Sequence, residues 1–459
     1  MEQITKPHCG ARLDRLPDCR WHSSMFAIVA FGLLVCWSNA VGGLILAQLK
    51  ALGWTDNSTT ATFSAITTAG MFLGALVGGI IGDKTGRRNA FILYEAIHIA
   101  SMVVGAFSPN MDFLIACRFV MGVGLGALLV TLFAGFTEYM PGRNRGTWSS
   151  RVSFIGNWSY PLCSLIAMGL TPLISAEWNW RVQLLIPAIL SLLATALAWR
   201  YFPESPRWLE SRGRYQEAEK VMRSIEEGVI RQTGKPLPPV VIADDGKAPQ
   251  AVPYSALLTG VLLKRVILGS CVLIAMNVVQ YTLINWLPTI FMTQGINLKD
   301  SIVLNTMSMF GAPFGIFIAM LVMDKIPRKT MGVGLLILIA VLGYIYSLQT
   351  SMLLITLIGF FLITFVYMYV CYASAVYVPE IWPTEAKLRG SGLADAVGRI
   401  SGIAAPYAVA VLLSSYGVTG VFILLGAVSI IVAIAIATIE IETKGVFVES
   451  LSIDAVVNK

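Results

Sequence analysis

Twelve apolar blocks, divided into two sets of six by a polar insert, are the feature of this sequence that most restricts its fold. The blocks lie at about 25–47, 61–82, 89–107, 112–134, 150–172 and 182–202, and then at about 266–292, 301–323, 331–348, 352–378, 391–413 and 418–439. A helix needs about 20 apolar residues to cross the hydrocarbon core of a bilayer. The pattern therefore predicts an all-α membrane protein with twelve transmembrane helices in two six-helix bundles.

Charged residues are scarce outside the connections between these blocks. They make up 13% of the chain, about half of the roughly 25% that is usual in soluble proteins, and the mean hydropathy is +0.72. This composition excludes a disordered protein, a fibrous protein and an ordinary soluble enzyme. The expected parts are an N-terminal tail, a first bundle, a linker with short helices, a second bundle and a C-terminal tail, at 1–24, 25–202, 203–265, 266–440 and 441–459.

The distribution of Lys and Arg predicts the orientation of the chain. The net charge is +7, and most of the 33 basic residues lie in the two tails, the insert and the even-numbered connections. Cytoplasmic connections of multi-pass proteins carry an excess of Lys and Arg, so we expect both termini and the insert to be cytoplasmic. Orientation explains this pattern better than a nucleic-acid surface does. The lipid bilayer is therefore an expected partner, and nucleic acid is not.

The sequence lacks the motifs of other membrane-protein classes. The seven cysteines are scattered without a CxxC pair, and there are only three histidines, so we expect neither a metal site nor a disulfide framework. HExxH, GxSxG and P-loop motifs are missing, which argues against a membrane enzyme and against ATP-driven transport by this chain alone. No cofactor is expected. A membrane sensor is a further alternative, although both tails are short.

A charged signature occurs at the same place in both halves of the chain. GIIGDKTGRR (79–88) connects the second and third blocks, and a related motif begins at Asp324 between the eighth and ninth blocks. The residues expected to form gating ion pairs at the cytoplasmic side are Asp83, Arg87, Arg88, Glu138, Arg145, Asp324, Glu380 and Arg389. Such a duplication is typical of transporters whose bundles rock around a central site. The competing interpretation is that the cations only fix the topology.

Further motifs complete a series along the chain. They are Arg118-x3-Gly122-x-Gly124-x-Gly126, PESPRWL (203–209), PEIWPTEAKLRG (379–390) and ETKG (442–445). The series resembles the major facilitator superfamily, in its sugar-porter and metabolite-symporter branch, over essentially the whole chain. The chain is similar to bacterial inner-membrane metabolite transporters of unassigned substrate, and the resemblance implies the inner membrane of a bacterium. It also implies an aspartate in the first block, where this chain has Ser38.

Ionisable residues inside apolar blocks are costly and are therefore candidates for a functional role. Glu95 and His98 lie three residues apart in the third block, on one face of the helix. A histidine titrates near neutral pH, so the pair could relay a proton; a structural pair is the alternative. The resemblance gives Arg118 a charge-pairing role in coupling.

The eleventh block contains a second charged pair. Asp395 and Arg399 are four residues apart, so they can pair on one helix face. The pair is structural in one interpretation. In the other, Arg399 is the counter-ion of a substrate carboxylate, which a guanidinium can bind through two hydrogen bonds, and Asp395 releases it during coupling. The GR-x2-G-x3-P pattern that begins at Gly398 is more similar to organic-ion and niacin-type relatives.

Neutral polar residues in the seventh block predict contacts with the substrate. Gln280 and Asn285 match the family's QxxxxN pattern, and their amides offer donors and acceptors, as a polyol requires. Trp286 adds an aromatic face. Further candidates for substrate binding are Asn39, Asn305 and Tyr372. For single asparagines, an interhelical hydrogen bond is the alternative.

Taken together, these residues predict a secondary active transporter that uses alternating access. We expect it to move a small polar metabolite (a sugar, a polyol or a sugar acid) across the cytoplasmic membrane, with protons as the driving ion. An organic-anion or aromatic-acid proton symporter, or a drug-type exporter, is the alternative within transport. The expected partners are the small-molecule substrate, protons and the bilayer, and the expected state is a monomer.

Overall fold

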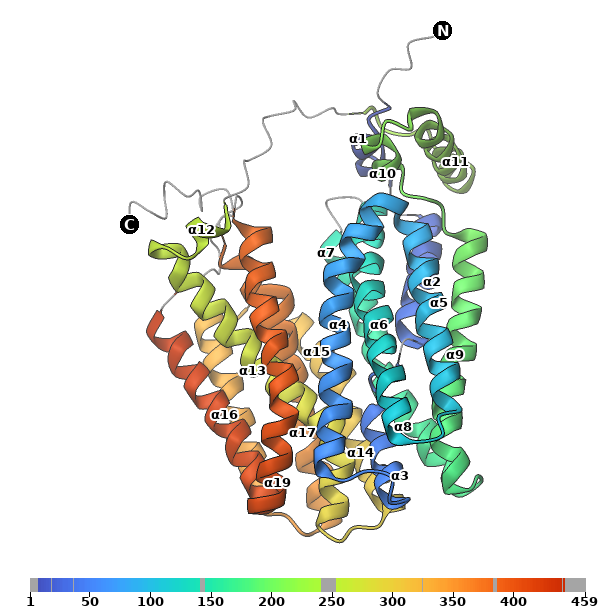
Figure 1. The fold of residues 1–459 in the computed structure, drawn as a ribbon. Coiled ribbons are helices and arrows are strands. Elements are labelled where there is room, and N and C mark those ends of the chain that lie inside the picture. The colour runs from blue at the N-terminus through green and yellow to red at the C-terminus, as the bar shows by residue number, and fades with distance from the viewer. Residues whose placement is uncertain are drawn as a thin grey trace. The chain divides into compact units, whose positions relative to one another are not determined.

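The computed structural model describes residues 7–17, 19–35, 37–140, 145–240, 253–323, 325–382, 386–439 and 441. Every regular element in this part of the chain is helical (Figure 1). The helices that precede the insert are α2 (Arg20–Val35), α3 (Gly42–Ala51), α4 (Asn57–Thr85), α5 (Arg87–Ala106), α6 (Met111–Tyr139), α7 (Arg145–Asn157), α8 (Ser159–Leu170) and α9 (Ala176–Tyr201). The helices that follow it are α13 (Gly260–Thr293), α14 (Leu298–Met309), α15 (Gly311–Val322), α16 (Arg328–Ser347), α17 (Met352–Val370), the π-helix η1 (Cys371–Tyr377), α18 (Val378–Glu380) and α19 (Lys387–Ile439).

The expected spans map onto these helices. Among the described residues, nine helical segments are long and apolar enough to cross a membrane. The first expected span is interrupted between α2 and α3, and the fifth is divided between α7 and α8. The eleventh and twelfth spans are joined in α19, where the backbone breaks at Gly417 with φ of 66°. The prediction of an all-α membrane protein is confirmed.

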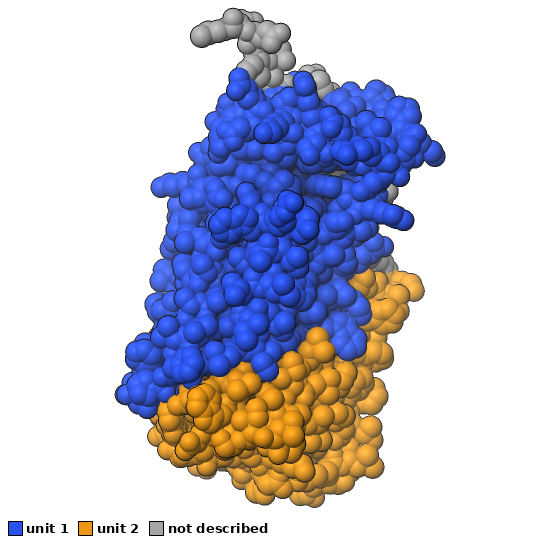
Figure 2. Space-filling view, turned by 90° about the vertical axis from the view of Figure 1, so that its right-hand side faces the viewer, with its two compact units in different colours: residues 1–39, 70–159, 184–246 blue, residues 40–69, 160–183, 247–459 orange. Residues whose placement is uncertain are grey.

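Contacts within the chain define two compact units, which Figure 2 colours separately. Unit 1 consists of residues 1–39, 70–159 and 184–246, and unit 2 contains the remaining segments. The units do not coincide with the two halves of the sequence, since 40–69 and 160–183 group with the second half. The bundle boundaries expected from the sequence remain a prediction.

Unit 2 joins helices from both halves of the chain through close backbone packing. Gly43 at the start of α3 packs against α13: a Cβ atom added there would lie 2.9 Å from the carbonyl oxygen of Asn285, and closer still to that of Ile284. At the start of α4, the Asn57 amide donates to the Ser414 hydroxyl at 2.9 Å. Small residues permit such approaches between membrane helices. The ends of the first and second spans are thus held against the second half.

A small helical module caps one end of unit 1 (Figure 1). It consists of α1 (Cys9–Asp14), α10 (Pro206–Ser211) and α11 (Tyr215–Thr233). Apolar side chains at helical spacing on α11 meet those of α1 and α10 in one buried cluster, which contains Cys9, Leu13, Leu16, Trp208, Leu209, Ala218, Met222, Ile225 and Val229. The N-terminal tail therefore packs against the insert, although some 200 residues separate them.

Ion pairs fasten α1 to α11. Arg12 donates to Glu226 at 2.7 and 3.0 Å and also pairs with Glu219, and Arg15 reaches Glu226 at 2.6 Å. Burial alone would raise the pKa of Glu226, but the hydrogen bonds from the two arginines outweigh it and lower this pKa. A carboxylate with a lowered pKa stabilises the folded state above its usual value of 4.5, and this contribution is lost as the pH falls through the lowered pKa.

Removal of the Glu226 charge is expected to release α1 and expose Cys9. Burial and the nearby Glu210 raise the pKa of the Cys9 thiol to about 12, so it should resist alkylation at pH 7. Glu226→Gln removes charge-assisted hydrogen bonds of about 1.5–3 kcal/mol each and should speed maleimide labelling of Cys9 at least tenfold. The matched control is Glu227→Gln, because Glu227 is exposed. Equal labelling of both variants would contradict the role of Glu226.

Candidate functional site

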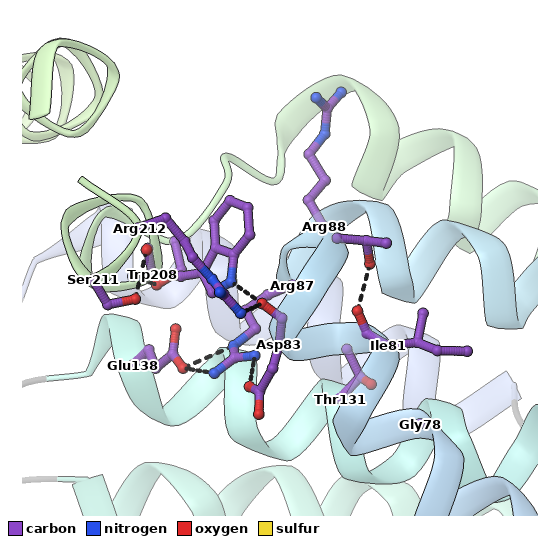
Figure 3. Close-up of polar contacts among 12 residues, drawn as sticks. Gly78, Ile81, Asp83, Arg87, Arg88, Thr131, Glu138, Trp208, Ser211 and Arg212 are labelled. Carbon is purple, nitrogen blue, oxygen red and sulfur yellow. Dashed lines mark hydrogen bonds and ion pairs between the residues drawn. The ribbon is translucent and has the colours of Figure 1, made fainter. Parts of the chain in front are cut away.

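A charged cluster lies at the connection between α4 and α5 in unit 1 (Figure 3). Gly86 ends α4 with a φ of 98°, so the chain turns directly into α5. The Arg87 guanidinium then lies between two carboxylates: it contacts Asp83 at 2.6 Å and Glu138 of α6 at 2.9 Å. Three of the predicted gating residues are therefore joined in one cluster.

Glu204, two residues before the start of α10, completes this cluster from the insert. Its carboxylate accepts hydrogen bonds from the backbone N–H groups of Arg87 at 2.7 Å and Arg88 at 3.2 Å, the first two residues of α5. A carboxylate at a helix N-terminus satisfies unpaired N–H groups and the positive end of the helix dipole. A Cβ atom at Gly86 would collide with this carboxylate. Glycine is therefore required there both for its φ and for space.

Two further contacts bind α10 to the cluster. The Trp208 indole N–H donates to the Asp83 backbone carbonyl at 2.7 Å, and the Arg207 guanidinium donates to the Glu138 backbone carbonyl at 3.0 Å. The insert thus contacts both α4 and α6 at the predicted gate, and Figure 3 shows the contact of Trp208 with Asp83 of α4. Any rearrangement of these two helices therefore involves the module.

The second half repeats the central pair. Arg328 at the start of α16 donates to both carboxylate oxygens of Glu380, each at 3.0 Å. Arg328 begins α16, which is the third expected span of the second half, and Arg87 begins α5, which is the third expected span of the first half. The two arginines therefore hold equivalent positions. Arg389 lies over the Tyr254 ring at 5.3 Å. Asp324 and the Arg145 side chain lie outside the described residues, so their predicted roles remain predictions.

Neutralising Asp83 is expected to slow transport with little loss of stability. The Asp83 side chain is 65% exposed, and exposed pairs contribute only about 0.2–1 kcal/mol. If that amount stabilises one conformation of the gate, Asp83→Asn should slow uptake by about 1.4- to fivefold at unchanged expression. Uptake by proteoliposomes measures this, with Asp112→Asn at the exposed start of α6 as the control. Normal uptake kinetics would remove Asp83 from the gate.

A series of buried polar groups lies in the interior of unit 1. Glu95 and His98 of α5 are both fully buried, with 3.6 Å between the Glu95 Oε2 and His98 Nδ1 atoms. His98 Nε2 lies 2.7 Å from the Ser38 hydroxyl. Arg118 of α6, which is 1% exposed, donates to the Ser38 backbone carbonyl at 2.6 Å. The sequence predicted Glu95 and His98 as a pair and Arg118 separately, and the structure joins them through Ser38 in one series.

The interruption between α2 and α3 makes this series of polar contacts possible. Ser38 lies in the non-helical turn of the first span, where its backbone carbonyl accepts from Arg118. Ser38 stands at the sequence position where the resemblance implies an aspartate. Irregular backbone inside a membrane protein is tolerated where it is buried or lines a site, and broken helices often form binding sites in transporters.

The Glu95 carboxylate lies at one end of this buried polar series. Neither carboxylate oxygen has a hydrogen-bond partner among the residues that the structure describes, and the same holds for His98 Nδ1. A buried carboxylate without hydrogen bonds is expensive in its charged form. Glu95 and His98 therefore remain candidates for the predicted proton relay.

The predicted substrate-binding residues of the second half lie in unit 2. Gln280, Tyr281, Asn285 and Trp286 are on α13, and a Cβ atom added at Gly402 of α19 would lie 3.1 Å from the Tyr281 ring. The Asp395–Arg399 pair, at 2.8 Å, lies on the same helix as Gly402. Close packing of α13 and α19 thus brings the amide candidates and the charged candidates to neighbouring positions.

The remaining candidates differ in their surroundings. The Asn305 amide donates to the Ser164 hydroxyl at 3.1 Å, which joins α14 to α8; its carbonyl oxygen has no partner among the described atoms. Tyr372 is fully buried in η1 and stacks on Tyr377 at 5.0 Å, as a packing residue does. Asn39 is half-buried beside Ser38. Substrate contact by these residues remains a prediction.

Several residues of these clusters were not among the predicted site residues. Glu204, Trp208 and Arg207 belong to PESPRWL, a motif that carried the resemblance without any assigned role. Arg328 stands in the second copy of the charged signature, and its likeness in position to Arg87 is the signal that could have identified it. The buried Tyr367 hydroxyl also lacks a hydrogen-bond partner within the described part of unit 2, and its ring lies 5.4 Å from that of Tyr160.

A duplicated helical chain with ion-pair clusters and a buried charged series is the architecture of a multi-pass membrane transporter. The model of the family described as "Sugar (and other) transporter" matches residues 24–455. The chain belongs to this family, and the resemblance to the major facilitator superfamily is confirmed. It is a transporter of sugars or other metabolites rather than an enzyme.

The comparisons with single proteins agree with this assignment. The chain is 99% identical over its full length to "Putative metabolite transport protein YdjK" of Escherichia coli K12, which it covers completely. It is 44% identical to "Inner membrane metabolite transport protein YdjE" of the same organism, over 98% of this chain and 99% of that one. It shares the fold of the xylose transporter XylE from E. coli, with a TM-score of 0.73 at 18% identity, over 93% of this chain and all of XylE.

Proposed function

We propose that this protein is a proton-coupled secondary active transporter of a small polar metabolite, namely a sugar, a polyol or a sugar acid. It acts as a monomer in a bacterial inner membrane, with both termini in the cytoplasm. The observation that carries the coupling is the buried series from Glu95 through His98 and Ser38 to Arg118. The inner-membrane location rests on the apolar helices and on the printed name of the 44% identical relative.

Proton coupling follows from the charge balance of this series. Arg118 carries one buried positive charge, and a deprotonated Glu95 offsets it across the bridge formed by His98 and Ser38. Uptake of one proton by Glu95 or His98 raises the net charge of this buried series by one. Such a charge is costly inside a membrane protein, so proton uptake and release can bias the arrangement of the broken first span. That span adjoins α13, where the substrate candidates lie.

The amide residues of α13 support a hydroxylated substrate. Gln280 and Asn285 together offer two carbonyl acceptors and two NH2 donors, and the guanidinium of Arg399 is paired with Asp395. A neutral polyhydroxylated solute needs no further charge at this site. The alternative is an organic-anion symporter, in which Arg399 leaves Asp395 and binds a substrate carboxylate.

The test is substrate-induced thermal stabilisation of the purified protein and of Gln280→Ala. Ligands raise apparent stability by mass action, so a panel of sugars, polyols, sugar acids and aromatic carboxylates reports the substrate class. We expect a polyhydroxylated solute to stabilise the protein, and Gln280→Ala to weaken it by about 1 kcal/mol or more, at least fivefold in Kd. Stabilisation by aromatic carboxylates alone would replace this proposal with organic-anion symport. Unchanged affinity would remove Gln280 from the site.

A further inference from the structure

A cavity of about 680 Å³ lies between the module and the helices of unit 1. The start of α2, the start of α5, the end of α9 and one face of α11 form its walls. The wall combines three cationic side chains with two carboxylates and with aromatic and aliphatic residues. The charged residues are Arg88, Arg214, Lys220, Glu204 and Glu217. The proposed transport mechanism does not use this cavity.

The cations of the cavity are incompletely neutralised. Arg214 is paired with Glu217 at 2.5 Å, and the Glu204 carboxylate accepts from the backbone N–H groups of α5. Lys220 has no ion-pair partner among the described residues, and neither has Arg88 within the same part of the chain. The positive charges of Arg88 and Lys220 therefore face the cavity without an ion-pair partner among the described residues.

The Arg88 side chain is fixed in a position that suits anion binding. One of its terminal nitrogens donates to the Trp199 carbonyl at 2.5 Å, which fixes the side chain against the end of α9. Its Nε atom is buried without a hydrogen-bond partner among the described atoms. Figure 3 shows its side chain directed away from the cluster around Arg87. An orphan donor on a fixed guanidinium suits an oxyanion, because arginine binds phosphate through several parallel hydrogen bonds.

The aromatic residues place the cavity at the membrane surface. Trp199 and Tyr201, in the last turn of α9, are 64% and 59% exposed. Exposed Trp and Tyr at the end of a membrane helix are typical of the level of the lipid headgroups. Trp21, Val221 and Ile225 supply an apolar wall beside the cations. The cavity therefore offers a charged part for a phosphate and an apolar part for the chain attached to it.

We propose that this cavity binds an anionic phosphate group, with Arg88 and Lys220 as its principal contacts. The phosphate belongs to the headgroup of an anionic phospholipid or to a small soluble phosphate ester, since both present the same oxyanion. Occupancy would bridge α5 to α11 and so fasten the module against the transmembrane helices. This inference is independent of the transported substrate.

The experiment measures ligand binding to the full-length protein by native mass spectrometry. One arm uses phosphatidylglycerol, with phosphatidylcholine as the zwitterionic control, and the other uses glycerol 3-phosphate and inorganic phosphate. The variants are Lys220→Gln and Arg88→Gln. The control is Lys235→Gln, which removes the same charge from an exposed position beyond the end of α11, outside the cavity.

Each outcome decides the proposal. We expect phosphatidylglycerol or a soluble phosphate to bind, and Lys220→Gln and Arg88→Gln each to weaken that ligand at least fivefold, while Lys235→Gln does not. Binding in the lipid arm alone assigns the site to a headgroup, and binding in the soluble arm alone assigns it to a metabolite. Absence of binding in both arms overturns the proposal. So does equal weakening by all three variants, because only bulk charge would then matter.

Discussion

Glu95→Gln is expected to abolish proton-driven accumulation of the substrate while facilitated exchange continues. Glutamine keeps the size of the side chain but cannot take up or release a proton. A one-proton symporter accumulates a neutral solute about tenfold per unit of pH difference, and the variant should accumulate none. The protein should still fold, since the amide occupies the same buried volume. Accumulation and counterflow in proteoliposomes, with and without a pH gradient, measure the two activities separately.

The control for this variant is Glu177→Gln in the exposed first turn of α9. It removes the same chemical group from a position outside the buried series and should accumulate substrate as the wild type does. If Glu95→Gln still concentrates the substrate tenfold per pH unit, Glu95 is a structural residue and the coupling assignment is wrong. Loss of counterflow as well as accumulation would also contradict it, because a residue needed only for the proton should spare exchange.

Gly43→Trp is expected to block net transport by preventing the packing of α3 on α13. A Cβ atom alone already collides with the Ile284 carbonyl oxygen, and an indole cannot fit there. Overpacking typically costs about 1–3 kcal/mol, which corresponds to as much as about a hundredfold in the population of this arrangement. Uptake should fall by at least tenfold, whereas substrate binding, measured by thermal stabilisation, should persist.

The matched control for this substitution is Gly169→Trp. Gly169 lies on α8 in the same unit, and a Cβ atom added there meets nothing within 4 Å. It introduces the same bulky side chain without disturbing the contact of α3 with α13. Wild-type uptake by Gly43→Trp would show that this contact is not part of the transport cycle. A fall in both variants would instead indicate a general intolerance of tryptophan in unit 2.

Local spacing was sufficient to predict some of these arrangements. The i, i+3 spacing of Glu95 and His98 and the i, i+4 spacing of Asp395 and Arg399 place each pair on one helix face, and the structure has both pairs in contact. The helical type of the elements followed from the apolar blocks, because a bilayer dictates both the length of a span and its backbone hydrogen bonding.

Other features depend on contacts that no local pattern contains. The partner of Arg118 is a backbone carbonyl, which becomes available only because the helix is interrupted at Ser38. Glu204 meets the N-terminus of α5 across 117 residues. The packing of α1 on the insert likewise joins the N-terminal tail to a linker for which the sequence predicted short helices but no partner. Each of these contacts depends on tertiary packing, so the sequence could identify the residues but not their partners.

The central claim is that substrate and protons move together through this protein. The most direct test encloses a pH-sensitive dye in proteoliposomes and adds the stabilising solute outside, in the absence of any imposed gradient. The account predicts that the lumen of wild-type vesicles becomes acidic as substrate enters, and that Glu95→Gln vesicles show no such change. Entry of labelled substrate into wild-type vesicles without any change in lumenal pH would contradict it.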